Sequence, residues 1–302
     1  MTSWTKDAFL NKSKGYVARA HEDRARGETF GLWYALALEH LLKAALSATN
    51  PVFVADPKHE ESLLHATGIM DSKRPKTASS ETLLNRSIAV IKDFEPRHRS
   101  IYEQMMRWRN EELHSGGEPF RNLQPNAWLV EYYVACGVLL RHLSMTLEEL
   151  FGPEEAVGAT KMIDAAEKRS VAHVRTLIKA ARDAFNALPV NAQSAAKQDA
   201  EQFSMYQTHA FDASKVCPAC GATGILHRQP FKEYEDRLED GLVYREYAVL
   251  PTGFACACCK LTLKTPADVA AQEWGEPEIV SVEVEPTYFY DEDGEPDEDD
   301  WR

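Results

Sequence analysis

The stretch FGLWYALALEHLLKAAL, residues 30–46, decides the fold of the first half of the chain. Its apolar residues fall on nearly every side of a helix, which is typical of a helix that is buried in a core. Glu39 and His40 interrupt the apolar run near its middle. We therefore predict a central buried helix here, with the other helices of this half packed around it.

Helices are expected on both sides of this stretch, because apolar residues recur there at helical spacing. The expected helices cover residues 3–26, 60–67, 80–93, a segment that begins at Pro96, and 128–151. Together they predict a mainly α fold, with an antiparallel helical bundle of about five helices over residues 1–151.

A second helical region is expected over residues 152–212. Its apolar residues follow a helical stripe through 154–188 and again through 192–209, and Pro189 separates the two helices. Helices of this amphipathic, alanine-rich kind serve as a spacer, as a dimerisation arm or as packing for the bundle. The sequence leaves these three roles open, and we treat the region as a helical spacer or arm.

Two Cys-x-x-Cys pairs then predict a metal site. The pairs are Cys217 with Cys220 and Cys256 with Cys259, and 35 residues separate the second cysteine from the third. Four thiolates at this spacing suit a tetrahedral, structural zinc site with strands between the pairs. The arrangement resembles a zinc ribbon, and we expect a small β domain of this kind over residues 213–270.

Three details of this β domain follow from the residues. Cys256 and Cys259 are the expected ligands of the second pair, and Cys258 is a less favoured alternative as a ligand. Residues 244–250 alternate as a strand does, and Asp240-Gly241 is a good turn. Redox use of the cysteine pairs is less favoured, because no βαβ pattern surrounds them.

The last segment, residues 271–302, is expected to be an acidic, disordered tail, apart from an edge strand at 279–284. Residues 291–300 (DEDGEPDEDD) hold eight acidic side chains. Its simplest role is to keep the protein soluble. A sharper alternative is an RNA mimic that occupies the chain's own active site or a partner's basic groove.

The composition limits the class of protein. The chain has 302 residues, 44% hydrophobic and 27% charged, as is ordinary for a soluble globular protein. The net charge of −13 argues against the broad basic surface of a general nucleic-acid binder, so any RNA contact should be local. The paired cysteines indicate a reducing compartment. No signal peptide or membrane-length apolar run is evident, so we expect a cytoplasmic protein without membrane contact.

The candidate catalytic residues lie in the segment RNEELH, residues 109–114. Asn110 and His114 are four residues apart, so they share one face of a helix. Gly116 and Gly117 follow as a helix-stop signal, which places His114 in the last turn. Arg109 supplies a fixed cation for a phosphate, Asn110 an orienting amide and His114 a group that exchanges protons near neutral pH. Such a set is suited to cleavage of a phosphodiester.

This segment resembles the ribonuclease motif of the HEPN superfamily, which has the form Arg-Asn-x-x-x-His. The apolar helix of residues 30–46 is similar to the second helix of HEPN domains, and the resemblance covers residues 1–151 only. It implies that His114 transfers a proton, Arg109 steadies the charge on the phosphate, and Asn110 orients one of them. Glu39 is a further candidate, as a buried carboxylate directed toward the motif helix.

The resemblance implies a metal-independent endoribonuclease in which the RNA 2′-hydroxyl attacks the adjacent phosphate. Enzymes of this kind commonly act as toxins or antiviral defence effectors on tRNA, mRNA or other RNA. A homodimer with a composite site and a companion defence or antitoxin protein are the implied partners. HEPN toxins that are silenced by adenylylation have a tyrosine two residues after the histidine. Here that position is Gly116, which argues against this control.

Several alternatives remain open at this point. Arg109 is also placed to form a surface ion pair with Glu112, Glu39 to pair with Lys43, and Arg107 to be the arginine of the motif. A non-catalytic HEPN module that holds a nucleotide, or a scaffold that recruits a partner through its zinc ribbon, is the rival function. A third possible function is that of a zinc-ribbon accessory protein in transcription or repair. The absence of a Lys/Arg cluster around either cysteine pair argues against this function.

Overall fold

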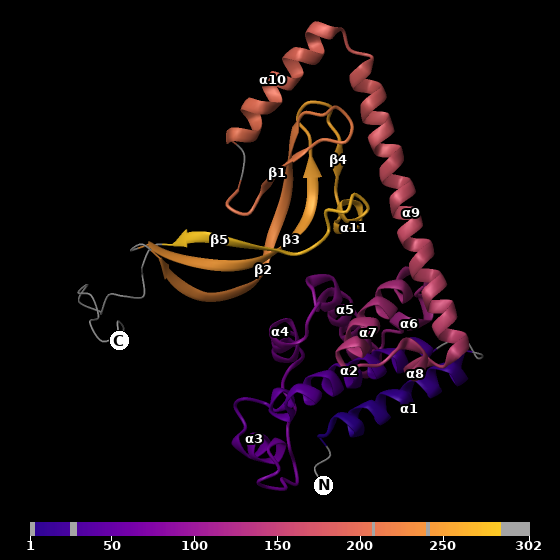
Figure 1. Cartoon of the computed structure of the whole chain (residues 1–302). Coiled ribbons are helices and arrows are strands. Elements are labelled where there is room, and N and C mark those ends of the chain that lie inside the picture. Colours follow the sequence, from indigo (N-terminus) through magenta and orange to yellow (C-terminus); the bar gives the residue numbers. More distant parts are fainter. Residues whose placement is uncertain (1–3, 25–28, 207–208, 240–241, 285–302) are drawn as a thin grey trace. The chain divides into compact units, whose positions relative to one another are not determined.

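The computed structural model describes residues 4–24, 29–206, 209–239 and 242–284. It divides the chain into two compact units, residues 1–166 and 167–302, and Figure 1 shows the elements of each. Helices make up the first unit, and the second contains a small antiparallel sheet and a cluster of four cysteines. The division falls within α9 (Pro153–Asn186), so residues of the expected spacer belong to both units.

In the described part of the first unit there are eight helices, two short 3-10 helices and the beginning of α9. These elements are α1 (Lys6–Arg24), α2 (Phe30–Thr49), η1 (Pro51–Val54), α3 (Glu60–Ala66), α4 (Ser80–Val90), α5 (Pro96–His114), α6 (Pro119–Asn122), η2 (Pro125–Ala127), α7 (Leu129–His142) and α8 (Leu147–Phe151). Helix α5 begins at Pro96 as predicted, because proline suits the first turn of a helix, where its missing N–H has no intrahelical partner.

Helix α2 lies in the middle of the apolar core of this unit, as its sequence predicts. Most of its residues are buried, and they contact apolar side chains of the surrounding helices. Two side-chain hydrogen bonds to its backbone hold the neighbours in place: Ser13 Oγ of α1 donates to the Ala37 carbonyl (2.8 Å), and the Tyr132 hydroxyl of α7 donates to the Tyr34 carbonyl (3.1 Å). The core therefore forms around α2.

The single helix predicted over residues 128–151 is wrong. Helix α7 ends at His142, and Ser144 takes a left-handed conformation (φ 58°) that no α-helix continues through. Helix α8 then begins after Thr146, whose hydroxyl and backbone N–H both bond to the Glu149 carboxylate. This Thr-x-x-Glu pattern is a helix-start signal within an otherwise continuous apolar periodicity.

Among its described residues, the second unit has the rest of α9, two further helices and five strands. These elements are α10 (Val190–Tyr206), β1 (Ala213–Val216), β2 (Thr223–Glu239), β3 (Leu242–Ala255), β4 (Thr262–Leu263), α11 (Pro266–Ala270) and β5 (Glu278–Val284). All strand pairs are antiparallel, in the order β1-β2-β3-β4, with β5 also paired to β3.

The two strands predicted in this unit are confirmed. Residues 244–250 lie within β3, and 279–284 form most of β5, which pairs with β3 along residues 243–249. The predicted Asp240-Gly241 turn and the acidic residues 285–302 lie outside the described residues.

The second half of α9 and helix α10 pack against the sheet. Val174, Ile178 and Phe185 of α9 join the same apolar core as Phe254 of β3. Arg182 Nη2 donates to the Pro218 carbonyl at 2.7 Å, which attaches α9 to the first cysteine pair. None of the three roles considered for this region includes this contact: within the second unit, these helices pack on the β domain.

Candidate functional site

Arg109 of α5 is directed toward the central helix α2, where it forms an ion pair with Glu39. Its Nη2 donates to Glu39 Oε2 at 2.9 Å, and Lys43 Nζ donates to the other oxygen, Oε1, at 2.7 Å. The side chains of Arg109, Glu39 and Lys43 are 19%, 16% and 8% exposed. The two alternatives for Glu39 are therefore both present: it pairs with Lys43, and it is directed toward the motif helix.

The charges of this cluster do not cancel. Burial on its own would raise the pKa of the Glu39 carboxyl, but the positive charge and hydrogen bond of Lys43, with a further contribution from Arg109, hold that pKa below its ordinary value. Glu39 is therefore ionised at neutral pH, and one carboxylate faces two cations. The three groups together keep one positive charge in a partly buried position, where an anion is favoured.

Sequence reasoning missed Tyr102, which also lies beside this cluster. It is two helical turns before Arg109 on α5, and its ring is fully buried. Burial raises the pKa of the Tyr102 hydroxyl, and the nearby Glu39 carboxylate raises it further, so the hydroxyl stays protonated. The seven-residue spacing on one helix is the signal by which Tyr102 could have been found.

Arg109 pairs with Glu39 and not with Glu112, so the predicted surface ion pair on α5 is wrong. The Arg109 Nε and the Glu112 Oε2 are both buried, and neither has a hydrogen-bond partner among the described residues. Arg107 is exposed and forms no ion pair within the described ranges. Only Arg109 of the two candidate arginines is held in a defined position.

His114 is the last residue of α5, as predicted, and both it and Asn110 are exposed. The structure thus brings Arg109 and Glu39 together, while no hydrogen bond within the described part of the chain joins either of the exposed residues to Arg109. The three residues of the motif lie along one stretch of α5, which begins at the partly buried Arg109 and ends at the exposed His114.

The helix stops for a reason other than the one expected from the glycine pair. Ser115 takes an extended conformation, its N–H and Oγ both donate to the Glu111 carbonyl, and Gly117 N–H donates to Ser115 Oγ. Neither Gly116 nor Gly117 has a positive φ. A Cβ on Gly117 would lie 2.6 Å from the carboxylate of the exposed Glu111 side chain, which would have to shift to accommodate it.

The second candidate site is the cluster of Cys217, Cys220, Cys256 and Cys259. Their sulfur atoms all lie within 4.8 Å of one another, with 3.5 Å between Cys217 and Cys259 and 3.6 Å between Cys220 and Cys256. Four thiolates at about 2.3 Å from a tetrahedral zinc ion would be about 3.8 Å apart. The cluster is therefore the right size to hold a metal ion.

The two cysteine pairs have the same backbone geometry, which shows why Cys258 is not in the cluster. In each pair the residue after the second cysteine, Gly221 or Lys260, has a positive φ and donates its N–H to the carbonyl of the first cysteine. Cys256 and Cys259 are the residues in register with Cys217 and Cys220. Lys260 adopts this conformation without being glycine, so only the folded loop reveals the match.

One thiol of the cluster ionises most easily. Hydrogen bonds from Cys217 and then from Cys259 lower the pKa of the Cys256 thiol. The same hydrogen bonds raise the pKa of the Cys217 and Cys259 thiols. A metal ion binds thiolates, so it would displace the protons that these thiols hold.

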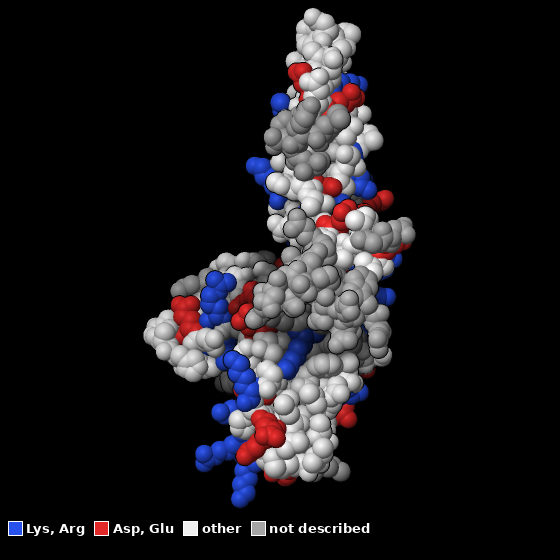
Figure 2. All heavy atoms as spheres, turned by 90° about the vertical axis from the view of Figure 1, so that its left-hand side faces the viewer, with Lys and Arg blue, Asp and Glu red and all other residues white. Residues whose placement is uncertain are grey.

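On the face drawn in Figure 2, Lys and Arg side chains lie among acidic and neutral residues instead of gathering into one continuous basic patch. This distribution agrees with the acidic composition. Within the described ranges, no helix has both the length and the apolar character that crossing a bilayer requires.

Comparison of the chain with protein-family models, with curated proteins and with solved structures finds no match.

Proposed function

We propose that the first unit is a HEPN-type endoribonuclease that cleaves RNA without a metal ion. The observation that supports this proposal best is the Arg109–Glu39 ion pair, which holds the arginine of the motif beside a surplus positive charge. Asn110 and His114 follow on the same helix and are open to solvent. A held cation and an accessible imidazole on one helix are groups that cleavage of a phosphodiester uses.

In this reaction the RNA 2′-hydroxyl attacks the adjacent phosphorus and the bond to the 5′-oxygen of the next nucleotide breaks. The products are a 2′,3′-cyclic phosphate and a free 5′-hydroxyl. His114 transfers a proton, Arg109 stabilises the negative charge that develops on the phosphate oxygens, and Asn110 orients the imidazole or the phosphate. Glu39 is a positioning residue, since it acts on the substrate only through Arg109.

The chain has one such motif, so we propose that two copies form a homodimer with a composite site. The substrate class is RNA, with tRNA and mRNA as the candidates, and the biological setting is a toxin or an antiviral defence effector, with a companion protein that restrains it. The four-cysteine cluster binds zinc, and because all four positions are filled by protein ligands the zinc is structural.

A second candidate function is a non-catalytic scaffold that recruits a partner through its zinc-binding β domain. The Arg109–Glu39 ion pair also supports this second function, because the pair can have a structural role. Because Nη2 of Arg109 is already bonded to Glu39, the arginine also serves to attach α5 to α2. If the protein is such a scaffold, Arg109 is needed for folding, and replacement of His114 affects neither folding nor function.

Cleavage of labelled RNA by purified variants distinguishes the two. His114→Ala should reduce cleavage by about 10²–10⁴ and Arg109→Ala by about 10²–10³, because a proton-transfer group and a donor to developing charge contribute about that much. Arg107→Ala, an exposed arginine two residues away on the same helix, is the matched control and should retain activity. The parent protein should remain active in EDTA as long as its zinc is retained, and a 2′-deoxy sugar at the cut site should block cleavage. Folded His114→Ala that cleaves RNA like the parent would leave the scaffold as the function.

A further inference from the structure

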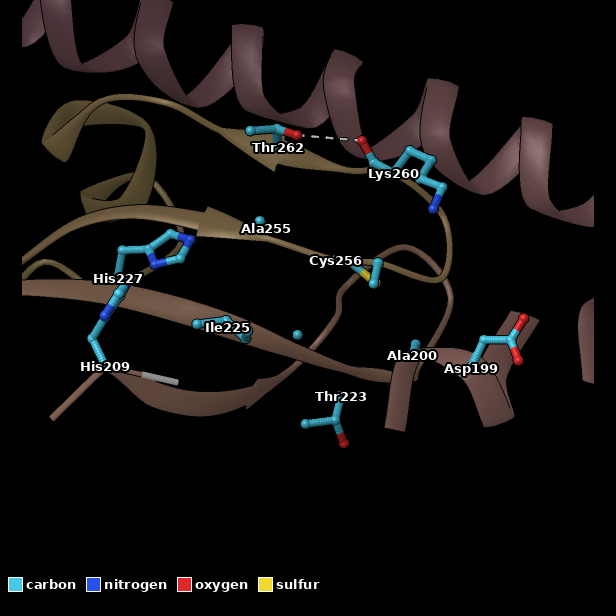
Figure 3. A pocket seen from close by; sticks show the side chains of 12 residues that line it. Asp199, Ala200, His209, Thr223, Ile225, His227, Ala255, Cys256, Lys260 and Thr262 are labelled. Atoms are coloured by element: carbon cyan, nitrogen blue, oxygen red, sulfur yellow. Dashed lines mark hydrogen bonds between the residues drawn. The ribbon is translucent and has the colours of Figure 1, made fainter. Parts of the chain in front are cut away.

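A cavity of about 520 Å³ lies in the second unit, between α10 and the sheet (Figure 3). It shares one wall with the cysteine cluster, since Cys256 is among its lining residues. The proposed nuclease chemistry does not use it. Its volume is within the range of about 300–1,000 Å³ that is typical of sites for small ligands.

One end of the cavity presents a histidine in a fixed orientation. His227 of β2 donates from Nδ1 to Asp212 Oδ2 at 3.2 Å, and the Asp212 side chain is only 3% exposed. The backbone N–H groups of His209 and Arg228 donate to the same carboxylate. A carboxylate only accepts, so the proton of the neutral His227 ring sits on Nδ1 and Nε2 is left as an acceptor.

The rest of the lining has a different character. The side chains of Ile225, Ala255 and Ala200 are apolar, and they form the floor of the cavity. Figure 3 shows His227 at one end of the cavity and Lys260 with Asp199 toward the other. Lys260 is exposed at this end and supplies a cation for a phosphate, whereas the Asp199 carboxylate points away from the other labelled residues.

We propose that this cavity binds a nucleoside monophosphate, either free or as one unit of a single-stranded RNA. The phosphate pairs with Lys260, and the base lies over the apolar floor. The edge of the base meets His227, where Nε2 accepts a hydrogen bond from an exocyclic amino group. The site therefore prefers a base with an amino group over one with a carbonyl in the same place.

The test uses the full-length, zinc-loaded protein with the His114→Ala substitution, so that RNA is not cut. Calorimetric titration with AMP and with IMP measures the preference, because IMP replaces the amino group of AMP by a carbonyl. We expect AMP to bind about tenfold more tightly, the equivalent of one hydrogen bond of about 1.4 kcal/mol. A short oligoadenylate serves as the second arm.

Two variants separate the contacts. His227→Phe should bring the ratio of AMP to IMP affinity close to one, while Lys260→Ala should weaken both ligands by about tenfold and leave the ratio unchanged. His173→Phe and Lys264→Ala, exposed residues of the same unit, are the matched controls. The zinc content of every variant is measured, since Lys260 follows a cysteine of the cluster.

Each outcome decides the proposal. Binding of the oligonucleotide but not of AMP, with loss of affinity in His227→Phe, assigns the site to a nucleotide within a strand. Absence of binding of both probes at millimolar concentration overturns the proposal, as does equal binding of AMP by the parent, His227→Phe and Lys260→Ala. Loss of RNA cleavage by the nuclease variants has no bearing on these results.

Discussion

Replacement of Glu39 by glutamine tests the ion-pair cluster at the start of the proposed site. Glutamine keeps the shape and a hydrogen-bond acceptor but removes the charge, so Lys43 and Arg109 face each other uncompensated. Removal of one partner of a buried ion pair costs about 3–5 kcal/mol. Because these side chains remain 8–19% exposed, water screens part of the repulsion, and we expect a loss of about 2–4 kcal/mol.

The loss is measured by urea unfolding and by the melting temperature. A unit of this size loses about 2–4 °C per kcal/mol, so Glu39→Gln should melt about 4–16 °C lower. The control is Glu103→Gln, which breaks a more exposed pair with Arg99 on the same helix α5 and should cost less than about 1 kcal/mol. Adding Lys43→Met to Glu39→Gln removes the repulsion and should recover about half of the loss.

The same variants separate stability from positioning. If Glu39 orients Arg109 for catalysis, the double variant should regain stability but not RNA cleavage. Equal stability losses in Glu39→Gln and Glu103→Gln would refute the reasoning about the buried cluster. Full cleavage by Glu39→Gln would show that Arg109 needs no carboxylate to position it.

Three other predictions concern the rest of the chain. Freshly purified protein should contain one zinc ion per chain, and Cys256→Ser should lose it while Cys258→Ser retains it, with metal analysis as the measurement; the reverse result would assign Cys258 to the site. Burial lowers the pKa of His98 from 6.5 to about 3, with smaller contributions from neighbouring arginines. As the pH falls, the unfolded chain therefore takes up this proton before the folded chain does. The neutral His98 makes its full contribution to the free energy of unfolding above pH 6.5. This contribution is lost as the pH falls toward 3, by up to about 1.4 kcal/mol per pH unit. His98→Gln should flatten the dependence of the urea midpoint on pH between 6.5 and about 5, where carboxyl groups remain ionised; an unchanged slope would contradict the buried neutral imidazole. Deletion of Asp291–Arg302 should change the melting temperature by no more than about 2 °C, because Trp301 is the only large apolar residue in this sequence. Higher RNA cleavage after deletion would support the RNA-mimic role over the solubilising one.

The features that the sequence determined by itself are local ones. Burial of α2 follows from apolar residues on all sides of residues 30–46, and the start of α5 follows from Pro96. The two Cys-x-x-Cys pairs identified the four cysteines that lie close enough together to bind a metal ion, because this spacing suits a tetrahedral site. Periodicity, proline and ligand spacing act within a few residues, so they can be recognised before the fold is known.

The features that only the tertiary structure decided depend on contacts between distant residues. Glu39 and Arg109 are 70 residues apart in the chain, and their pairing exists because α5 packs on α2. The spacing of the pairs already favoured Cys259 over Cys258, but the left-handed backbone at Lys260, which gives the second pair the same geometry as the first, is not predicted by any propensity of lysine. Likewise Asp212 orients His227 only once β1 and β2 have paired. These features arise only when the chain folds, and a pattern along the sequence does not show which distant residues come into contact.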